Sequence, residues 1–370
     1  MLIASRTGVR IGRAASEAVT DVSGIAEVAR LAGVSKSTAS RALGGTGYVS
    51  EETRQRVHQA AASIGYVPST SAVSLATGRT QNIGVVMPYV NRWFFAEVLE
   101  GIQQVLLAQG LDLTLYDAKP GTEGRNRIFE DFLARKRFDG LIAVGLEPDH
   151  QELDRLVAIG RPIVSVVGSS NVTTVVEIDD DHVARRATEH LIALGHRDIA
   201  FIGGGLSTHW AQVDRRRLDG YLNAMKTAGL SDHVRHIYSD VTLPGGYASA
   251  VDALGEARGR PTAIVATCDE VAIGAIIAAR RLGVQVPSDL SVIGIDDHEF
   301  ADMFALTTLR QTPREQGRVA VQLLLEHLDD PTQPPKTVRM TSQLVVRNST
   351  AALDPRASAV AIDGRRRGGL

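Results

Sequence analysis

Residues 24–43, GIAEVARLAGVSKSTASRAL, decide how the N-terminal part of this chain folds. Their pattern predicts two short helices joined by a tight turn. Apolar residues at i, i+3, i+4 and i+7 give the first helix one apolar stripe, formed by Ile25, Val28, Ala29 and Ala32. Gly33 stands where a left-handed residue ends a helix, and Ser35 can cap the next one. The stretch therefore predicts a helix-turn-helix.

The second helix of this pair has two different faces. Ala39 and Leu43 are expected on the inward face, and the outward side carries Lys36, Ser37, Ser40 and Arg41. A short helix with small apolar residues inward and donors outward suits the major groove of DNA. An ordinary helical hairpin with solvated charges is the alternative interpretation.

A third helix is expected directly after this pair. Ser50 can cap it, and Glu51 and Glu52 follow at the positive end of its dipole. Its apolar stripe consists of Val57, Ala60, Ala61 and Ile64, and the chain then leaves the helix at Gly65 and Pro68. Three helices within residues 23–67 predict a small DNA-binding headpiece.

These motifs resemble the lactose/galactose-repressor (LacI/GalR) family of bacterial transcription regulators. The matching residues are Gly33, Val34, Ser35, Thr38, Ser40, Arg41, Val49, Ser50, Thr53, Arg54, Val57, Gly65, Tyr66 and Pro68. The resemblance extends from about residue 24 to residue 350. It implies that DNA is contacted by Lys36, Ser37, Thr38, Ser40, Arg41, Ser50 and Thr53.

Residues 68–80 are small and polar and by themselves indicate a linker. The family resemblance implies a hinge that becomes helical on operator DNA. Leu75 then matches the leucine that wedges between base steps, and Ala72 matches a small residue that lets two hinge helices approach. The segment departs from the family at Ser69 and Val73, where an asparagine and an arginine are usual.

Charge and composition favour a nucleic-acid-binding head on a larger body. The net charge of the 370 residues is −2, but residues 1–80 carry nine Lys or Arg and five Asp or Glu. The single cysteine, Cys268, suits a reducing compartment, and there is no run of about eighteen apolar residues that could span a membrane. We expect a cytoplasmic, nucleoid-associated protein without membrane contact. Disordered segments are expected at residues 1–22 and 351–370.

Residues 81–350 alternate strands and helices, which predicts an α/β fold. The expected strands are 83–87, 111–115, 140–144, 162–167, 199–202, 263–266 and 290–295. The expected helices are 94–109, 127–134, 152–159, 180–194, 215–228, 246–257 and 271–282. Two successive parallel sets predict two similar subdomains with a ligand crevice at the carboxyl ends of the strands. The resemblance implies a two-lobed body like a periplasmic sugar-binding protein, with several chain crossings between the lobes.

Candidate effector-binding residues lie at these strand ends and helix starts. Asp296 follows a strand, where a carboxylate can accept two hydroxyl groups. The resemblance adds Arg217 as a ligand clamp, Gln311 as a polar residue bridging the lobes, and Phe94 and Phe95 as an aromatic pair. Cys268 stands where the family often has asparagine, and Val167-Gly168 where it often has Asp-Arg, so a less polyhydroxylated effector is possible.

Structural interpretations of the same residues stay open. Asp296 or Asp297 can cap a turn, and the run from Arg215 to Arg217 can be a solvated helix face. Phe94 and Phe95 can belong to the core. Cys268 is expected as a packing thiol rather than a nucleophile, and His190 and His196 lack the partners of a metal site.

The chain is therefore expected to be a transcription regulator, usually a repressor, and not an enzyme. Neither a Walker loop nor a Gly-x-Ser-x-Gly elbow is present, and no metal or other cofactor is expected. The expected partners are double-stranded operator DNA, a small effector such as a sugar or related metabolite, and a second copy of the chain in a homodimer. A binding protein or sugar-metabolism enzyme with a vestigial headpiece is the alternative.

Overall fold

The computed structural model describes residues 24–45, 47–67, 78–168, 172–204, 211–255 and 259–353. The chain divides into two compact units, with the boundary between Gln81 and Asn82. Leu75 and most of the expected hinge lie outside the described residues, as do the expected N-terminal arm and all but residues 351–353 of the tail.

The first unit contains the predicted helix-turn-helix and a third helix. Its helices are α1 (Ile25–Ala32), α2 (Lys36–Gly44) and α3 (Glu51–Ser63). Gly33 ends α1 at a φ of +66°, a conformation that costs glycine little. The hydroxyl oxygens of Ser35 and Ser50 accept hydrogen bonds from the backbone N–H groups of Thr38 and Thr53, so both predicted caps are confirmed.

The core of this unit is built from small residues contributed by all three helices. Val28, Ala39 and Val57 are completely buried at its centre. Ala42 is also buried, whereas Leu43, predicted for the inward face, is only half-buried. Leu43 nevertheless packs against the same cluster, so Ala39, Ala42 and Leu43 all face the core of this unit.

The second unit contains two six-stranded sheets, which confirms the α/β prediction of two similar lobes. The first lobe has strands β1 (Asn82–Met87), β2 (Asp112–Asp117), β3 (Gly140–Val144), β4 (Ile163–Val166), β5 (Thr174–Glu177) and β11 (Thr337–Arg339). Its strand order is β2-β1-β3-β4-β5-β11, and all of these pairs are parallel.

The second lobe repeats the arrangement. Its strands are β6 (Ile199–Ile202), β7 (Arg235–Ile237), β8 (Ala263–Ala266), β9 (Ser291–Asp296), β10 (Thr307–Arg310) and β12 (Gln343–Val345). The order is β7-β6-β8-β9-β10-β12, and only β12 runs antiparallel to its neighbour. Parallel sheets place the carboxyl ends of their strands at one edge, where α/β proteins bind ligands.

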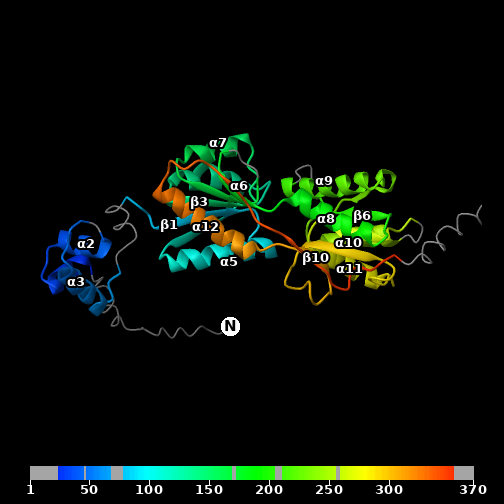
Figure 1. The fold of residues 1–370 in the computed structure, drawn as a ribbon. Coiled ribbons are helices and arrows are strands. Elements are labelled where there is room, and N and C mark those ends of the chain that lie inside the picture. Colours follow the sequence, from blue (N-terminus) through cyan, green and yellow to red (C-terminus); the bar gives the residue numbers. More distant parts are fainter. Residues whose placement is uncertain are drawn as a thin grey trace, which may run out of the picture. The chain divides into compact units, whose positions relative to one another are not determined.

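Helices cover both sheets (Figure 1). The first lobe has α5 (Trp93–Ala108), α6 (Glu123–Arg127), α7 (His150–Ala158) and α12 (Pro313–Asp329), and the second has α8 (Asp180–Ala193), α9 (Gln212–Thr227), α10 (Leu243–Gly255) and α11 (Asp269–Arg281). The helix expected at 127–134 is different: α6 begins earlier and continues as a π-helical turn, Ile128–Phe132, and a short 3-10 turn, Leu133–Arg135.

The chain crosses between the lobes three times. It passes from β5 to α8, from β10 to α12, and from β11 to β12. Helix α12 thus follows a second-lobe strand but packs beside α5 of the first lobe (Figure 1). The several crossings implied by the family resemblance are therefore present, and the crossing segments are the only described connections between the two sheets along the chain.

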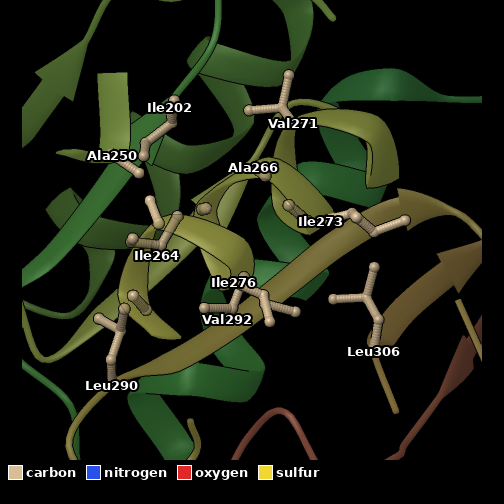
Figure 2. Close-up of a cluster of buried hydrophobic side chains, with 14 of the residues drawn as sticks. Ile202, Ala250, Ile264, Ala266, Val271, Ile273, Ile276, Leu290, Val292 and Leu306 are labelled. Carbon is tan, nitrogen blue, oxygen red and sulfur yellow. The ribbon is translucent and has the colours of Figure 1, made fainter. Parts of the chain in front are cut away.

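The core of the second lobe holds the strand ends in place. Figure 2 shows the buried cluster formed by α10, α11 and the strands beneath them, with Ile264, Ile276 and Val292 at its centre. Gly246 and Gly274 permit this packing, because a Cβ on either would lie within 2.6 Å of backbone atoms of the facing helix. Close packing of this kind fixes the positions at which β8 and β9 deliver their polar residues.

Candidate functional site

The candidate DNA-contacting residues of the headpiece lie on α2 and at the start of α3. Lys36, Ser37 and Arg41 are exposed on α2, whereas Thr38 and Ser40 are half-buried. The Arg41 Nε atom donates to the carbonyl oxygen of Ser37 at 3.2 Å, and the side chain is exposed. Such an arginine can donate to two acceptors on a base edge.

Several predicted DNA contacts also have a structural role. The Ser50 hydroxyl donates to the Thr53 Oγ1 atom at 2.9 Å, and Thr38 shares a hydroxyl contact with the cap residue Ser35. Tyr48 was not singled out from the sequence, although its side chain is 93% exposed between α2 and α3. Its position between Gly45, which ends α2, and Ser50, which caps α3, is the sequence signal that could have marked Tyr48 as an exposed residue near the candidate DNA-contacting residues.

A second candidate site lies at the carboxyl ends of the second-lobe strands, and Arg217 is the basic side chain at its centre. Arg217 is buried on α9, where its Nε donates to Asp180 at 2.8 Å and its Nη1 to the carbonyl oxygen of Thr267 at 2.6 Å. Burial opposes the charge, but the carboxylates of Asp180, Asp296 and Asp214 together raise the pKa of Arg217. The solvated-face interpretation is wrong for this arginine.

Acidic groups outnumber bases around Arg217. Burial raises the pKa of the Asp180 carboxyl and of the Asp214 carboxyl, even though Arg217 favours the ionised form of both. The Thr267 hydroxyl donates to Asp214 at 2.8 Å and so ties α9 to the end of β8. Asp180 and Asp214 were missed by sequence reasoning, but each lies in the first turn of its helix, α8 and α9.

Asp296 ends β9 in an unusual backbone conformation. Its φ is +133°, and its side chain is buried. Burial raises the pKa of its carboxyl to about 6, against the opposing effects of Arg217 and of a hydrogen bond from Gln311. A strained residue with a perturbed carboxyl at a strand end is typical of functional sites.

The structure brings Asp296 and Gln311 into direct contact. The Gln311 Nε2 atom donates to Asp296 Oδ1 at 2.5 Å, and the Gln311 backbone N–H donates to the Asp296 carbonyl oxygen at 3.2 Å. Asp297 instead forms ion pairs with Arg310 at 2.5 Å and Arg347 at 2.7 Å. The structural interpretation therefore fits Asp297, whereas Asp296 joins the buried polar group around Arg217.

Asp269 anchors the start of α11 beside these groups. It is completely buried and accepts hydrogen bonds from the His298 backbone N–H at 2.9 Å and the Thr308 hydroxyl at 2.6 Å. Burial and then the charge of Asp296 raise the pKa of its carboxyl. Asp269 thus ties the start of α11 to the segment after β9 and to strand β10.

Cys268 precedes Asp269 and is 6% exposed within the second-lobe core. Burial raises the pKa of its thiol, and the nearby charge of Asp296 raises it further. A buried thiol that resists ionisation is a poor nucleophile. The packing interpretation fits this environment.

The aromatic pair of the first lobe lies mainly in the core. Phe94 and Phe95 are half-buried against the first-lobe cluster, with their ring centroids 5.5 Å apart, and Phe95 also packs 5.8 Å from Tyr89. The aromatic residue that reaches the other lobe is Trp93, whose ring lies 4.8 Å from that of His298. Trp93 was not predicted as a site residue, because nothing in a single sequence pairs it with a residue two hundred positions away.

A separate hollow of about 470 Å³ lies between the first lobe and α9. Its walls include Leu146, Leu156 and Ile163 of the first lobe and Arg216 and Asp219 of α9. None of the candidate effector residues lines it. Within the described residues, no group of three or more His, Cys, Asp or Glu side chains could hold a metal ion.

The described helices also include none long and apolar enough to cross a membrane.

A helix-turn-helix headpiece followed by a two-lobed α/β body defines a class of ligand-responsive DNA-binding regulators. The family model of the bacterial regulatory proteins of the lacI family matches residues 24–69, and that of the periplasmic binding protein-like domain matches residues 188–350. The chain belongs to the lacI family of bacterial transcription regulators.

Curated relatives match over nearly their whole length. The chain is 34% identical over 342 residues to the HTH-type transcriptional repressor PurR of Glaesserella parasuis, covering 89% of this chain and 99% of that protein. It is 32% identical over 340 residues to the repressor of the same name from Vibrio campbellii, with the same coverage. These relatives are repressors rather than enzymes.

Solved structures agree with this assignment. The chain is similar to the Lac repressor dimer bound to operator and the anti-inducer ONPF, with a TM-score of 0.78, 27% identity, and coverage of 89% of this chain and 99% of that one. It is also similar to a LacI family regulator from Enterococcus faecium with bound ribose, with a TM-score of 0.66, 26% identity, and coverage of 74% and 100%.

Proposed function

We propose that this regulator represses transcription by binding an operator through its headpiece, and that a small effector bound between its lobes changes operator affinity. The curated relatives are named transcriptional repressors, and one similar structure is bound to operator DNA. The vestigial-headpiece alternative is disfavoured, because both helix caps and the three-helix core of the headpiece are complete.

The DNA-binding half of the proposal assigns base recognition to α2. Lys36, Ser37 and Arg41 are exposed on it, and Thr38, Ser40, Ser50 and Thr53 would support phosphate contacts around its ends. We assign the headpiece to residues 23–67 and the hinge to residues 68–80, where Leu75 would act as the minor-groove wedge. One headpiece makes few base contacts, so a homodimer on a near-palindromic operator is proposed.

The effector half rests on one observation: Arg217, Asp296 and Gln311, from three separate elements, form one buried polar group at the strand ends of the second lobe. Such a group offers both donors and acceptors to the hydroxyls of a small metabolite. Similar regulators are described with bound ribose or as a complex with cellobiose. We therefore propose a sugar or related metabolite as effector, within a body spanning residues 81–350.

The test begins with selection of operator DNA from a random library by the full-length chain. A thermal-shift screen of sugars and related metabolites then identifies a ligand, which is added to operator titrations. We expect a selected palindromic motif and an effector-dependent change in operator affinity of roughly 5- to 150-fold. Selected DNA without a sequence motif would overturn the first half, and a bound ligand that leaves operator affinity unchanged would overturn the second.

A further inference from the structure

Three buried side chains form a hydrogen-bonded chain from the second lobe to the first. Asp296 ends β9 of the second lobe, Gln311 lies in the crossing segment after β10, and Gln316 lies in the first turn of α12. Gln311 donates to Asp296 Oδ1 at 2.5 Å, and the Gln316 Nε2 atom donates to Gln311 Oε1 at 2.9 Å. Their exposed fractions are 6%, 4% and 0%.

The direction of this chain is dictated by Asp296. An ionised carboxylate only accepts hydrogen bonds, so Gln311 must turn its NH₂ group toward Asp296. Its amide oxygen then faces Gln316, which must turn its own NH₂ group toward Gln311. The orientation of each amide therefore follows from the charge at the other end of the chain.

The chain ends at an unsatisfied atom in the first lobe. Gln316 Oε1 is buried and has no hydrogen-bond partner among the described residues. A buried acceptor without a partner costs free energy that an apolar side chain of similar size would avoid. Packing alone therefore does not account for glutamine at this position, whereas supplying a donor to Gln311 does.

Helix α12 holds Gln316 firmly in the first lobe. A Cβ on Gly317 would lie 2.2 Å from the carbonyl oxygen of Val98, and one on Gly101 would lie 2.0 Å from that of Arg314, so α12 and α5 are in backbone contact. Arg314 adds ion pairs to Glu97 at 2.6 Å and Glu100 at 3.0 Å. Gln316 is thus a donor whose position is set by the first lobe.

We propose that Gln316 is a positioning residue for the candidate effector site: through Gln311 it orients the Asp296 carboxylate, and so couples the second lobe to α12 of the first. The relevance of this coupling to regulation rests on the proposed function, in which Asp296 faces the effector. Any ligand group that takes over the Gln311 contact on Asp296 would release Gln311, and Gln316 would lose its acceptor.

The test reverses the direction in which hydrogen bonds are donated along the three side chains. Gln316→Glu keeps the shape of the side chain but, when ionised, accepts instead of donating, so it conflicts with Asp296. Asp296→Asn supplies an amide donor and allows the chain to run the other way, from residue 296 through Gln311 to residue 316. Urea unfolding of the full-length chain at about pH 8 is followed by tryptophan fluorescence, because both tryptophans, Trp93 and Trp210, lie beyond the headpiece.

We expect Gln316→Glu to raise the unfolding equilibrium constant at least about tenfold more in the wild-type background than in Asp296→Asn. Repulsion between two carboxylates could imitate this rescue, so the same pair is measured in a Gln311→Leu background. There the rescue should disappear. Equal effects of Gln316→Glu in the first two backgrounds, or rescue that persists with Gln311→Leu, would overturn the proposal.

A second double-mutant cycle covers the case in which the Gln316→Glu variant does not fold. Gln316→Met and Asp296→Asn, which do not touch each other directly, should show a coupling of about threefold or more when Gln311 is present and none with Gln311→Leu. Additive effects in both backgrounds would overturn the proposal. Neither cycle uses DNA or effector, so failure here leaves the proposed function unaffected, and failure to find an effector leaves the coupling intact.

Discussion

Trp93 and His298 stack across the two lobes, with their ring centroids 4.8 Å apart and the rings inclined by 35°. Trp93 opens α5 of the first lobe, and His298 follows β9 of the second. Burial lowers the pKa of His298, and its Nδ1 atom accepts from the Phe300 backbone N–H at 3.0 Å. The contact joins two elements that a change in lobe arrangement would separate.

Trp93 fluorescence should therefore report lobe movement. In a Trp210→Phe background, the effector found by screening should shift the emission of Trp93, because its environment includes the opposite lobe. His298→Ala should reduce that shift, since the ring contact is already lost. An unchanged spectrum on saturation with an effector that alters operator affinity would contradict this.

Arg41→Ala should weaken operator binding by about 1–3 kcal/mol and relax the preference at one base position. The physical reason is the loss of an exposed guanidinium on α2 that can donate to two acceptors of one base. Gln59→Ala, at an exposed position on α3, is the matched control and should bind like wild type. Mobility-shift titrations on the selected operator and its single-base variants provide the measurement.

Arg125→Met should lower the free energy of unfolding by about 3–5 kcal/mol, because it leaves Glu152 charged and buried. Arg125 donates to both Glu152 oxygens, at 2.6 and 2.7 Å, and to the carbonyl oxygens of Ala118 and Glu147. Urea unfolding followed by fluorescence measures the effect.

A matched control exists in the same lobe. Arg155 pairs with Glu130 at 3.2 Å, but the two side chains are 40% and 55% exposed. Arg155→Met should change the free energy of unfolding by less than about 1 kcal/mol. Similar losses for Arg125→Met and Arg155→Met would show that burial is not what makes the Arg125 pair important.

Asp296→Asn should change how stability depends on pH. Burial raises the pKa of this carboxyl from 3.8 to about 6, so between these values the folded state binds more protons than the unfolded state. The contribution of Asp296 to stability is therefore greatest below about pH 4 and falls as the pH rises through 6. Relative to wild type, Asp296→Asn should gain stability over this range, by up to about 3 kcal/mol. Parallel pH profiles for the two proteins would contradict the shift.

Much of the fold could be predicted because its signals are local. Helix caps and left-handed glycines fix where α1, α2 and α3 begin and end, and continuous apolar runs fix β3, β6 and β8 to the residue. The short strands β5, β7, β10, β11 and β12 were not predicted, since each has three or four residues and is defined by its neighbours in the sheet. Helix α12 was also missed, although Pro313 is typical of a first helical turn.

The grouping of the candidate effector residues was predicted in part. The strand pattern placed Asp296 at a strand end, and the family resemblance added Arg217, Gln311 and Cys268. The structure brings these four residues close together, and effector binding by them stays a prediction. The aromatic pair could not be placed, because only packing decides that Phe94 and Phe95 lie against the first-lobe core while Trp93 reaches His298. The role of Gln316 depends on the path of a crossing segment, which no periodicity encodes.

The three crossings also determine the order in which the body is completed during synthesis. The second-lobe sheet up to β10 is formed by continuous chain from β6, so most of that lobe is available to fold as soon as β10 leaves the ribosome. The first-lobe sheet is completed later. Helix α5 packs against α12 and strand β5 pairs with β11, and both of these partners are translated more than 150 residues after α5 and β5. A nascent chain thus carries an unfinished first lobe, with the apolar face that α12 covers still open, until the last fifth of the chain is made.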